Sequence, residues 1–180
     1  MRTSQSFLCL AILALWAALP AARQRAPAPV AVFETAKGVF EIEFFPAEAP
    51  KSVAHIVALV ERRFYRGQRV HRATAGLVQF GDPQSRDMTR RDAWGRAGSG
   101  RTIGVAEFSK RTHARGIVSL AHPGNAANAD SQLFIVKANA PAYDGQYTIV
   151  GRVTRGMDVV DRLAVADVLK QVTLKGAGRP

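Results

Sequence analysis

Cysteine is almost absent from this sequence. Cys9 is the only cysteine among 180 residues, and it lies in an apolar stretch close to the N-terminus. A single thiol cannot form an intramolecular disulfide, so the sequence excludes a small domain built on a disulfide framework. The folded part of the chain must therefore be stabilised by packing, whatever the redox state of its surroundings.

The chain also lacks the residue spacings that mark several kinds of active site. Its four histidines are not paired as metal ligands usually are, so no metal site is expected. Asp130, Ser131 and His122 occur close together, but no G-x-S-x-G segment accompanies them, which argues against a serine hydrolase. The glycine-rich segment 95–100, GRAGSG, is not followed by a helical pattern, so we interpret it as a plain loop and not as a phosphate-binding one.

Acidic residues are scarce relative to basic ones, 14 against 25, which gives a formal net charge of +11. Such an excess can attract nucleic acids or other anionic partners. However, most basic residues are scattered, and the densest group is interrupted by aspartates and glycines, with only Trp94 available to stack on a base. This group comprises Arg86, Arg90, Arg91, Arg96 and Arg101. We therefore favour a solvated basic loop and expect no specific nucleic-acid partner.

Only one long hydrophobic run is present, at the N-terminus. A basic residue, Arg2, precedes the apolar residues 7–19, and small residues follow. This layout predicts a signal peptide over residues 1–22, since the run is short for a membrane span. Residues 23–29, RQRAPAP, are interpreted as a Pro/Ala tether. We expect a periplasmic or otherwise exported protein that has no membrane attachment after cleavage. An uncleaved N-terminal anchor is the alternative, because the residues before the cleavage site fit the usual pattern poorly.

Residues 30–176 are predicted to form one domain. Over residues 30–45, apolar and polar side chains alternate on both sides of Lys37-Gly38, which indicates two strands joined by a hairpin. The next segment predicts a helix that begins at Pro50 and ends near Arg63. Its apolar face comprises Val53, Ile56, Val57 and Val60. His55 lies off that face, and we expect it to be exposed.

The remaining sequence is rich in short strand patterns. Residues 84–105 are predicted to be a long surface loop. Three runs with many β-branched and aromatic residues follow, and they read GIVSLAH, QLFIVKA and YTIVGRV. A helix with Met157, Val160 and Ala164 on one face precedes a closing strand, QVTLK. About eight strands and two helices favour a closed barrel or a sandwich.

Four ordered segments of the chain read APKSVAHIVALVERRFYRG, VHRATAGLVQFGDP, GIVSLAHPGNAANADSQLFIV and YDGQYTIVGRVTRGMDVVDRLA. Together they resemble segments of the cyclophilins, the cyclophilin-type peptidyl-prolyl cis-trans isomerases, and in particular of bacterial, exported members. The resemblance extends from Val30 to about Lys175. It implies a mainly β fold, a closed eight-stranded antiparallel β-barrel capped by two α-helices.

The resemblance also implies which residues form the site. Arg72 and Gln79 match the family's catalytic positions. The matching substrate-binding positions are Phe134, Ala121, His122, Gln132, Leu77, Tyr143 and Tyr147. No metal or cofactor is implied.

Three departures from the family pattern affect the site. The signature is one residue short between His71-Arg72 and Gly81, and either Leu77 or Gly76 stands where a pocket aromatic is usual. A one-residue slip turns strand side chains to the other face, so a bulge is expected if Arg72 and Gln79 are to share the groove. Ala142 replaces a tryptophan, whose space Tyr143 partly fills. Phe80 replaces a glycine.

The implied chemistry needs only a few polar groups. Twisting an X–Pro bond meets a barrier of about 18–20 kcal/mol, whereas cis and trans differ by only about 0.5–1 kcal/mol. The enzyme must favour the twisted amide, and the guanidinium of Arg72 can donate to the proline nitrogen as it becomes pyramidal. We expect a monomeric isomerase that acts on proline-containing unfolded or flexible polypeptides during the folding of exported proteins. A catalytically weak peptide-binding or chaperone module is the alternative.

Overall fold

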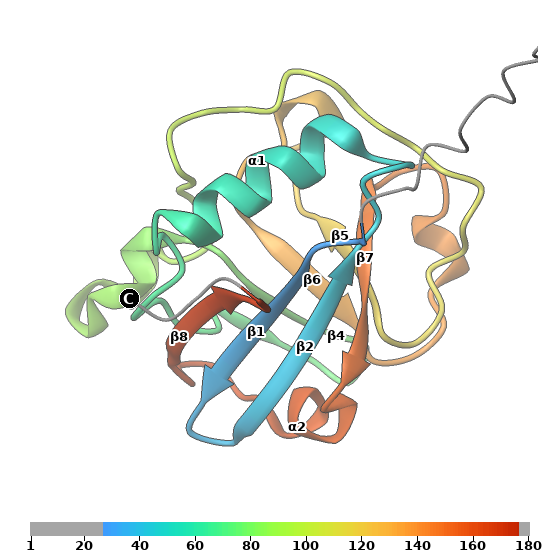
Figure 1. Ribbon diagram of the computed structural model, residues 1–180. Coiled ribbons are helices and arrows are strands. Elements are labelled where there is room, and N and C mark those ends of the chain that lie inside the picture. The colour runs from blue at the N-terminus through green and yellow to red at the C-terminus, as the bar shows by residue number, and fades with distance from the viewer. Residues whose placement is uncertain (1–26, 177–180) are drawn as a thin grey trace, which may run out of the picture.

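The computed structural model describes residues 27–176 and shows a sheet of eight strands that curls around a core (Figure 1). The strands are β1 (Val30–Thr35), β2 (Gly38–Phe44), β3 (Arg72–Ala73), β4 (Leu77–Phe80), β5 (Ile117–Leu120), β6 (Leu133–Val136), β7 (Ile149–Arg155) and β8 (Leu169–Leu174). All pairings are antiparallel, and the spatial order is β3-β4-β6-β5-β7-β2-β1-β8. The mainly β prediction is confirmed, and so is the hairpin, in which Thr35 pairs with Gly38.

The sheet is a curled half-barrel, so the prediction of a closed barrel was wrong in that respect. The strands at its two ends, β3 and β8, are not paired with each other. The gap is spanned by the segments that precede these two strands, where Arg69 forms an isolated bridge with Val168. Closure would need two long edge strands in register, whereas β3 has only two residues.

Two α-helices cover the ends of the sheet, as predicted (Figure 1). Helix α1 (Pro50–Glu61) buries Val53, Ile56 and Val60 in the core. It stops because Arg63 adopts a left-handed backbone conformation, with φ of 57°. Helix α2 (Met157–Arg162) is shorter than predicted: Leu163 is already extended, so Ala164 does not belong to its buried face.

The N-terminus of α1 is capped from a distant part of the sequence. Ala49 provides no side-chain cap, and Pro50 occupies the first turn. The backbone N–H groups of Lys51 and Ser52 donate to the Glu107 carboxylate over 3.1 and 2.8 Å. A negative charge at this position also complements the helix dipole.

Replacing Glu107 by alanine should therefore destabilise the fold. We expect the free energy of unfolding to fall by about 1 kcal/mol, the usual effect of losing a helix cap. Urea denaturation followed by far-UV circular dichroism measures this change. Glu107→Gln is the matched control, because it keeps an acceptor and should lose less. Equal stability of Glu107→Ala and the wild type would contradict the role of this carboxylate as a cap.

The sheet separates two apolar clusters. The inner cluster is the core, where the rings of Phe33 and Phe40 stack at 4.8 Å and Phe80 packs against Phe33 at 5.5 Å. A second cluster lies on the other face of β4, β5 and β6 and includes Phe134 and Leu77. Burial on both faces explains why β5 and β6 have no exposed residue.

The predicted surface loop 84–105 contains short helical turns. The four 3₁₀ helices of the described chain are η1 (Pro83–Arg86), η2 (Met88–Ala93), η3 (Ala126–Asn128) and η4 (Pro141–Tyr143). Single aspartates cap the first two, Asp82 for η1 and Asp87 for η2. The apolar periodicity used to predict helices does not detect such short turns.

The predicted signal peptide, residues 1–22, lies outside the described residues, as does most of the predicted tether 23–29. None of the helices within residues 27–176 has the length and apolar composition needed to cross a membrane.

Candidate active site

The hairpin formed by β3 and β4 places Arg72 opposite Gln79. Directly opposed residues of an antiparallel pair project from the same face of the sheet. The short connection is a tight turn, in which the Thr74 hydroxyl oxygen accepts the N–H groups of Gly76 and Leu77 over 3.2 and 3.1 Å. The pairing has no register shift, so the expected bulge is absent. The shortened segment is accommodated in the turn and not in the strands.

The same register continues across the sheet. Gln79 on β4 pairs with Phe134 on β6, and Phe134 pairs with Ser119 on β5. These side chains therefore share the outer face with Arg72, while their strand neighbours Val78 and Ile135 point into the core. Four adjacent strands thus present one row of functional groups on the outside of the sheet.

A pocket of about 130 Å³ lies over this row. Eight of the nine residues predicted for the site line it: Arg72, Leu77, Gln79, Ala121, His122, Phe134, Tyr143 and Tyr147. Leu77 is the residue that faces the pocket in place of an aromatic ring, and Gly76 lies in the turn. The ninth predicted residue, Gln132, lines an adjoining pocket.

Aromatic rings form the floor and one wall of the small pocket. Phe134 is 3% exposed, and it meets Tyr147 at 5.1 Å and Tyr143 at 5.7 Å, edge to face in both cases. Tyr143 lines the pocket, whereas the neighbouring Ala142 is exposed and does not line it. His122 closes the rim, where its Nε2–H donates to the Gln146 carbonyl oxygen over 3.1 Å.

His113 supports the floor from behind, and the sequence patterns did not indicate it. Its buried ring lies parallel to Phe134 at 6.2 Å. Nδ1–H donates to the Asp144 carboxylate over 2.8 Å, which lowers the pKa of Asp144, and Nε2 accepts from the Ser119 hydroxyl over 2.9 Å. These contacts resemble a serine–histidine–aspartate triad, but Ser119 is 0% exposed. The arrangement therefore fixes Phe134 and offers no nucleophile to a substrate.

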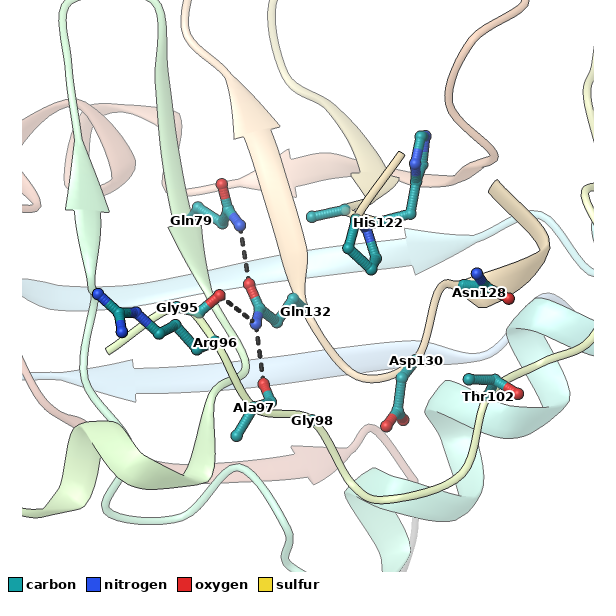
Figure 2. Close-up of a pocket in the computed structure, with 12 residues that line it drawn as sticks. Gln79, Gly95, Arg96, Ala97, Gly98, Thr102, His122, Asn128, Asp130 and Gln132 are labelled. Carbon is teal, nitrogen blue, oxygen red and sulfur yellow. Dashed lines mark hydrogen bonds between the residues drawn. The ribbon is translucent and has the colours of Figure 1, made fainter. Parts of the chain in front are cut away.

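Gln79 is oriented by a chain of hydrogen bonds (Figure 2). Its amide Nε2 donates to Oε1 of Gln132 over 2.9 Å. Gln132 in turn donates to the carbonyl oxygens of Gly95 and Ala97 over 3.0 and 2.8 Å. The Gln79 amide group is thus held with its nitrogen toward Gln132, so its oxygen is directed away from Gln132.

Asp82 anchors the loop on which Gln132 depends. This carboxylate is completely buried, and one oxygen accepts the N–H groups of Gly95, Arg96 and Ala97. The other accepts the N–H of Gln84 over 2.7 Å. In the glycine-rich loop, the backbone N–H groups of residues 95–97 therefore bind a carboxylate of the protein itself. This agrees with the interpretation of the segment as a plain loop.

Gly81 permits the close packing beside Asp82. Its φ is 110°, which disfavours any residue with a side chain. A Cβ atom there would lie 2.3 Å from the carbonyl oxygen of Ser131. Only glycine lets the end of β4 approach β6 this closely.

His71 lies beside Arg72, and its ring packs under the same loop. A Cβ atom on Gly95 would lie 3.2 Å from Cδ2 of His71. Burial lowers the pKa of His71 below its ordinary value, although the nearby Asp82 acts in the opposite direction. The imidazole of His71 is therefore neutral at pH 7. The positive charge beside the small pocket is that of Arg72.

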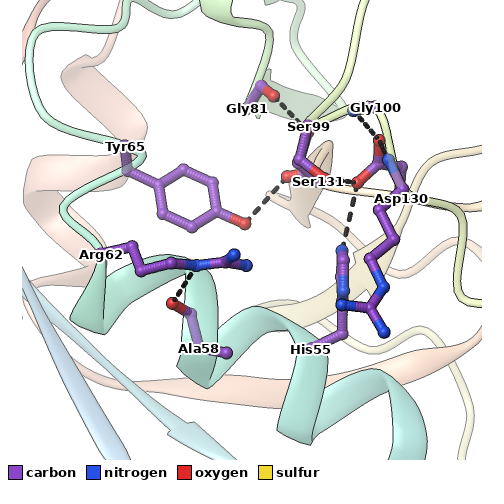
Figure 3. Close-up of polar contacts among 10 residues, drawn as sticks. His55, Ala58, Arg62, Tyr65, Gly81, Ser99, Gly100, Asp130 and Ser131 are labelled. Atoms are coloured by element: carbon purple, nitrogen blue, oxygen red, sulfur yellow. Dashed lines mark hydrogen bonds and ion pairs between the residues drawn. The ribbon is translucent and has the colours of Figure 1, made fainter.

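Asp130 ties three segments together at the far side of the adjoining pocket (Figure 3). It accepts a hydrogen bond from Nε2–H of His55 on α1 over 3.1 Å and one from the Ser99 hydroxyl. Its second oxygen accepts the N–H groups of Gly100 and Arg101. The expectation that His55 is exposed was wrong, since its side chain is only 11% exposed. Burial would raise the pKa of Asp130, but these hydrogen bonds outweigh it and hold the pKa below its usual value.

The lowered pKa of Asp130 predicts a pH-dependent contribution to stability. A depressed carboxylate pKa stabilises the fold above the unfolded pKa of about 4, and this contribution is lost as pH falls through the folded pKa. At pH 7, Asp130→Asn should lower the free energy of unfolding by about 1–3 kcal/mol.

Denaturant titrations of the wild type and Asp130→Asn at several pH values measure this effect. The difference between the two proteins should shrink as pH falls from 5 to 2. A difference that stays constant over this range would mean that the Asp130 charge does not stabilise the fold.

Residues 27–176 contain no group of three or more histidine, cysteine or acidic side chains that could hold a metal ion. The site consists of the guanidinium of Arg72, the oriented amide of Gln79 and an apolar pocket. This combination can bind a small apolar ring and donate hydrogen bonds beside it.

Comparison with known proteins agrees with this geometry. Residues 30–178 match the family model described as cyclophilin type peptidyl-prolyl cis-trans isomerase/CLD. A peptidyl-prolyl cis-trans isomerase of Helicobacter pylori is 31% identical over 151 residues, which are 82% of this chain and 87% of the relative. The Bacillus subtilis peptidyl-prolyl cis-trans isomerase B is 35% identical over 138 residues, 76% of this chain and 90% of the relative.

Solved structures share the fold at lower sequence identity. A Hirschia baltica cyclophilin, AquaCyp293, superposes with a TM-score of 0.71 at 21% identity and covers 86% of this chain and 76% of its own. A Cryptosporidium parvum cyclophilin-type isomerase gives 0.70 at 21% identity, with 85% and 99% covered. The family-model match and the sequence relatives show that this chain belongs to the cyclophilin-type peptidyl-prolyl cis-trans isomerases.

Proposed function

We propose that the protein accelerates X–Pro isomerisation in unfolded or flexible exported polypeptides, with Arg72 and Gln79 as its catalytic residues. One observation carries this assignment of roles: Arg72 and Gln79 are directly opposed on β3 and β4, at the mouth of a pocket floored by Phe134. The shortened signature therefore does not separate them.

Catalysis requires tighter binding of the twisted amide than of either planar form. As the C–N bond twists, the proline nitrogen loses its resonance and gains a lone pair. The exposed Arg72 guanidinium donates to this nitrogen and, through its remaining N–H groups, to the proline carbonyl oxygen. Each 1.36 kcal/mol of stabilisation confined to the twisted state raises the rate about tenfold.

The pocket holds the ring while the preceding residue rotates. Phe134, Leu77 and Tyr143 offer apolar surface to the pyrrolidine, and Phe134 is fixed from behind by His113. Gln79, whose nitrogen is bound to Gln132, uses its carbonyl oxygen to orient Arg72 or to accept a substrate N–H. A Cryptosporidium parvum cyclophilin-type isomerase has been crystallised in the presence of the dipeptide Ala-Pro, which supports proline-containing peptides as the ligand class.

Export is supported by the sequence before the domain. Arg2, the apolar residues 7–19 and the following alanines have the layout of a signal peptide. We propose a periplasmic or otherwise exported monomer. Mass spectrometry of the mature protein from a secreting host tests the cleavage, and a mature N-terminus at Met1 would favour an uncleaved anchor instead.

Exchange spectroscopy on an X–Pro peptide tests the activity. The mature protein should increase the cis-trans exchange rate of the peptide well above its uncatalysed value at catalytic concentrations. Absence of any increase would contradict the proposal.

The alternative is a weak peptide-binding module, favoured by Leu77 and Ala142 where larger aromatic side chains are usual. It predicts chemical-shift changes on peptide addition without faster exchange between the two isomers. The common face shared by Arg72 and Gln79 favours the enzyme.

A further inference from the structure

The positive charge of the domain is concentrated in one segment. Residues 62–101 hold ten arginines and three aspartates, whereas the rest of residues 27–176 hold eleven basic and eleven acidic side chains. Within the described chain, the basic residues outside this segment supply every arginine and lysine ion pair, for example Arg111 with Glu48 and Arg115 with Asp161. None of the ten arginines of residues 62–101 forms an ion pair with another residue of the described chain.

These arginines are unpaired because the nearby carboxylates are occupied. Asp82 is buried and accepts four backbone N–H groups. Asp87 accepts the N–H and hydroxyl of Thr89. Asp130 is bound by His55, Ser99 and two backbone N–H groups. Of the nearby acids, Asp87, Asp92 and Glu61 are exposed. Three acids cannot balance ten arginines, so the excess of positive charge is not neutralised.

The charge lies beside the substrate groove. Arg72 lines the proline pocket, and Arg96 lines the adjoining pocket, whose volume is about 520 Å³. Arg101 is exposed and is attached through its backbone to Asp130, on the wall of the same pocket. Arg62 follows directly after α1, two helical turns from His55, and its Nε–H donates to the Ala58 carbonyl oxygen (Figure 3). The only acid that lines either pocket is Asp130, and both of its oxygens accept hydrogen bonds.

We propose that the groove selects proline segments that carry aspartate or glutamate within a few residues of the proline. This inference rests on the proposed function. A chain whose proline occupies the small pocket must pass over the adjoining pocket or over the rim around Arg72. Acidic side chains there meet unpaired guanidinium groups, which bind carboxylates through paired N–H donors.

A nucleic acid fits this surface less well than an acidic polypeptide. Single-stranded nucleic acids need exposed aromatic faces for base stacking. Trp94 is the one aromatic side chain of the loop 86–101, and the guanidinium of Arg91 lies 5.4 Å from the centre of its ring. Its Nε1–H donates to the Asp87 carbonyl oxygen. The loop 86–101 thus provides charge without a free stacking platform.

Matched peptides test the preference. Three X–Pro peptides of equal length would carry glutamate, glutamine or lysine at the two positions before and the two after the X–Pro pair. At about 50 mM salt we expect kcat/KM about five- to tenfold higher for the glutamate peptide than for the glutamine peptide, and lowest for the lysine peptide. The ratio should fall toward one at 0.5 M salt, since charges at the surface are screened.

Charge-removing variants locate the effect. Arg96→Ala/Arg101→Ala should reduce the glutamate-to-glutamine ratio at least threefold. Lys37→Ala/Lys170→Ala removes the same charge from exposed lysines in the β1–β2 turn and β8 and should leave the ratio unchanged. An equal change in both variants, or a wild-type ratio near one, would overturn the proposal.

Peptide titrations by NMR separate this inference from the proposed function. If none of the peptides is isomerised faster than in buffer, the proposed function fails, and the order of dissociation constants still decides the preference. Glutamate peptides that bind no tighter than glutamine peptides would refute it. A single-stranded oligonucleotide that displaces the glutamate peptide at 0.15 M salt, with a dependence on base sequence, would also refute it and identify a nucleic-acid surface.

Discussion

Arg72→Ala is expected to lower kcat/KM on X–Pro peptides by about 10²- to 10³-fold, the usual effect of removing one hydrogen-bond donor that acts in the transition state. Arg72 is exposed and has no ion-pair partner within the described chain. Its loss should therefore leave the melting temperature almost unchanged. Exchange spectroscopy gives the rate, and thermal denaturation gives the stability.

Arg72→Lys is the matched control for this prediction. Lysine keeps the charge but lacks the planar fork that donates to the proline nitrogen and carbonyl together. We expect an activity between those of Arg72→Ala and the wild type. If Arg72→Ala lost less than fivefold in kcat/KM while peptide binding was unchanged, a purely steric mechanism in the pocket would be favoured.

Elements with regular periodicity were predictable from the sequence. In β2, Phe40, Ile42 and Phe44 alternate with glutamates, and all three are fully buried. Helix α1 presents its apolar residues at helical spacing and ends within two residues of the predicted position. Helix α2 was overextended, because a pattern of three apolar residues does not reveal that the backbone turns at Leu163.

Whether Arg72 and Gln79 project from the same face of the sheet depended on the conformation of the turn between β3 and β4, which a residue count does not reveal. Counting residues suggested that one missing residue would turn one of the two side chains away, unless a bulge intervened. Thr74 instead closes a tight turn with its hydroxyl group, and the two strands remain in register. Because the missing residue is lost from the turn, the pairing between β3 and β4 is unchanged.

The supports of the site were not predictable, because each joins residues far apart in the sequence. Asp82 binds a loop 13–15 residues away, and Asp130 binds His55 across 75 residues. His113 occurs in a segment without periodicity. Asp82 also caps η1, and this role was not predicted from the sequence either.

Asp82→Ala is expected to lower the free energy of unfolding by about 3 kcal/mol, the order of magnitude for removal of a buried charged acceptor. Four backbone N–H groups would lose their partner inside the protein. Asp92→Ala is the matched control, because Asp92 is exposed on η2, and it should change stability by less than about 0.5 kcal/mol. Guanidinium denaturation followed by tryptophan fluorescence measures both.

Activity should also fall in Asp82→Ala, even under conditions where the protein remains folded. Without Asp82, residues 95–97 are released, so Gln132 loses the fixed carbonyl groups that it binds and Gln79 loses its orientation. If Asp82 positions Gln79 in this way, Gln132→Ala should lower kcat/KM in the otherwise wild-type protein. Added to Asp82→Ala, the same change should cause little further loss, because both substitutions break the same chain of hydrogen bonds. Fully additive losses would show that Asp82 affects activity by a route other than the hydrogen bonds of Gln132 and Gln79.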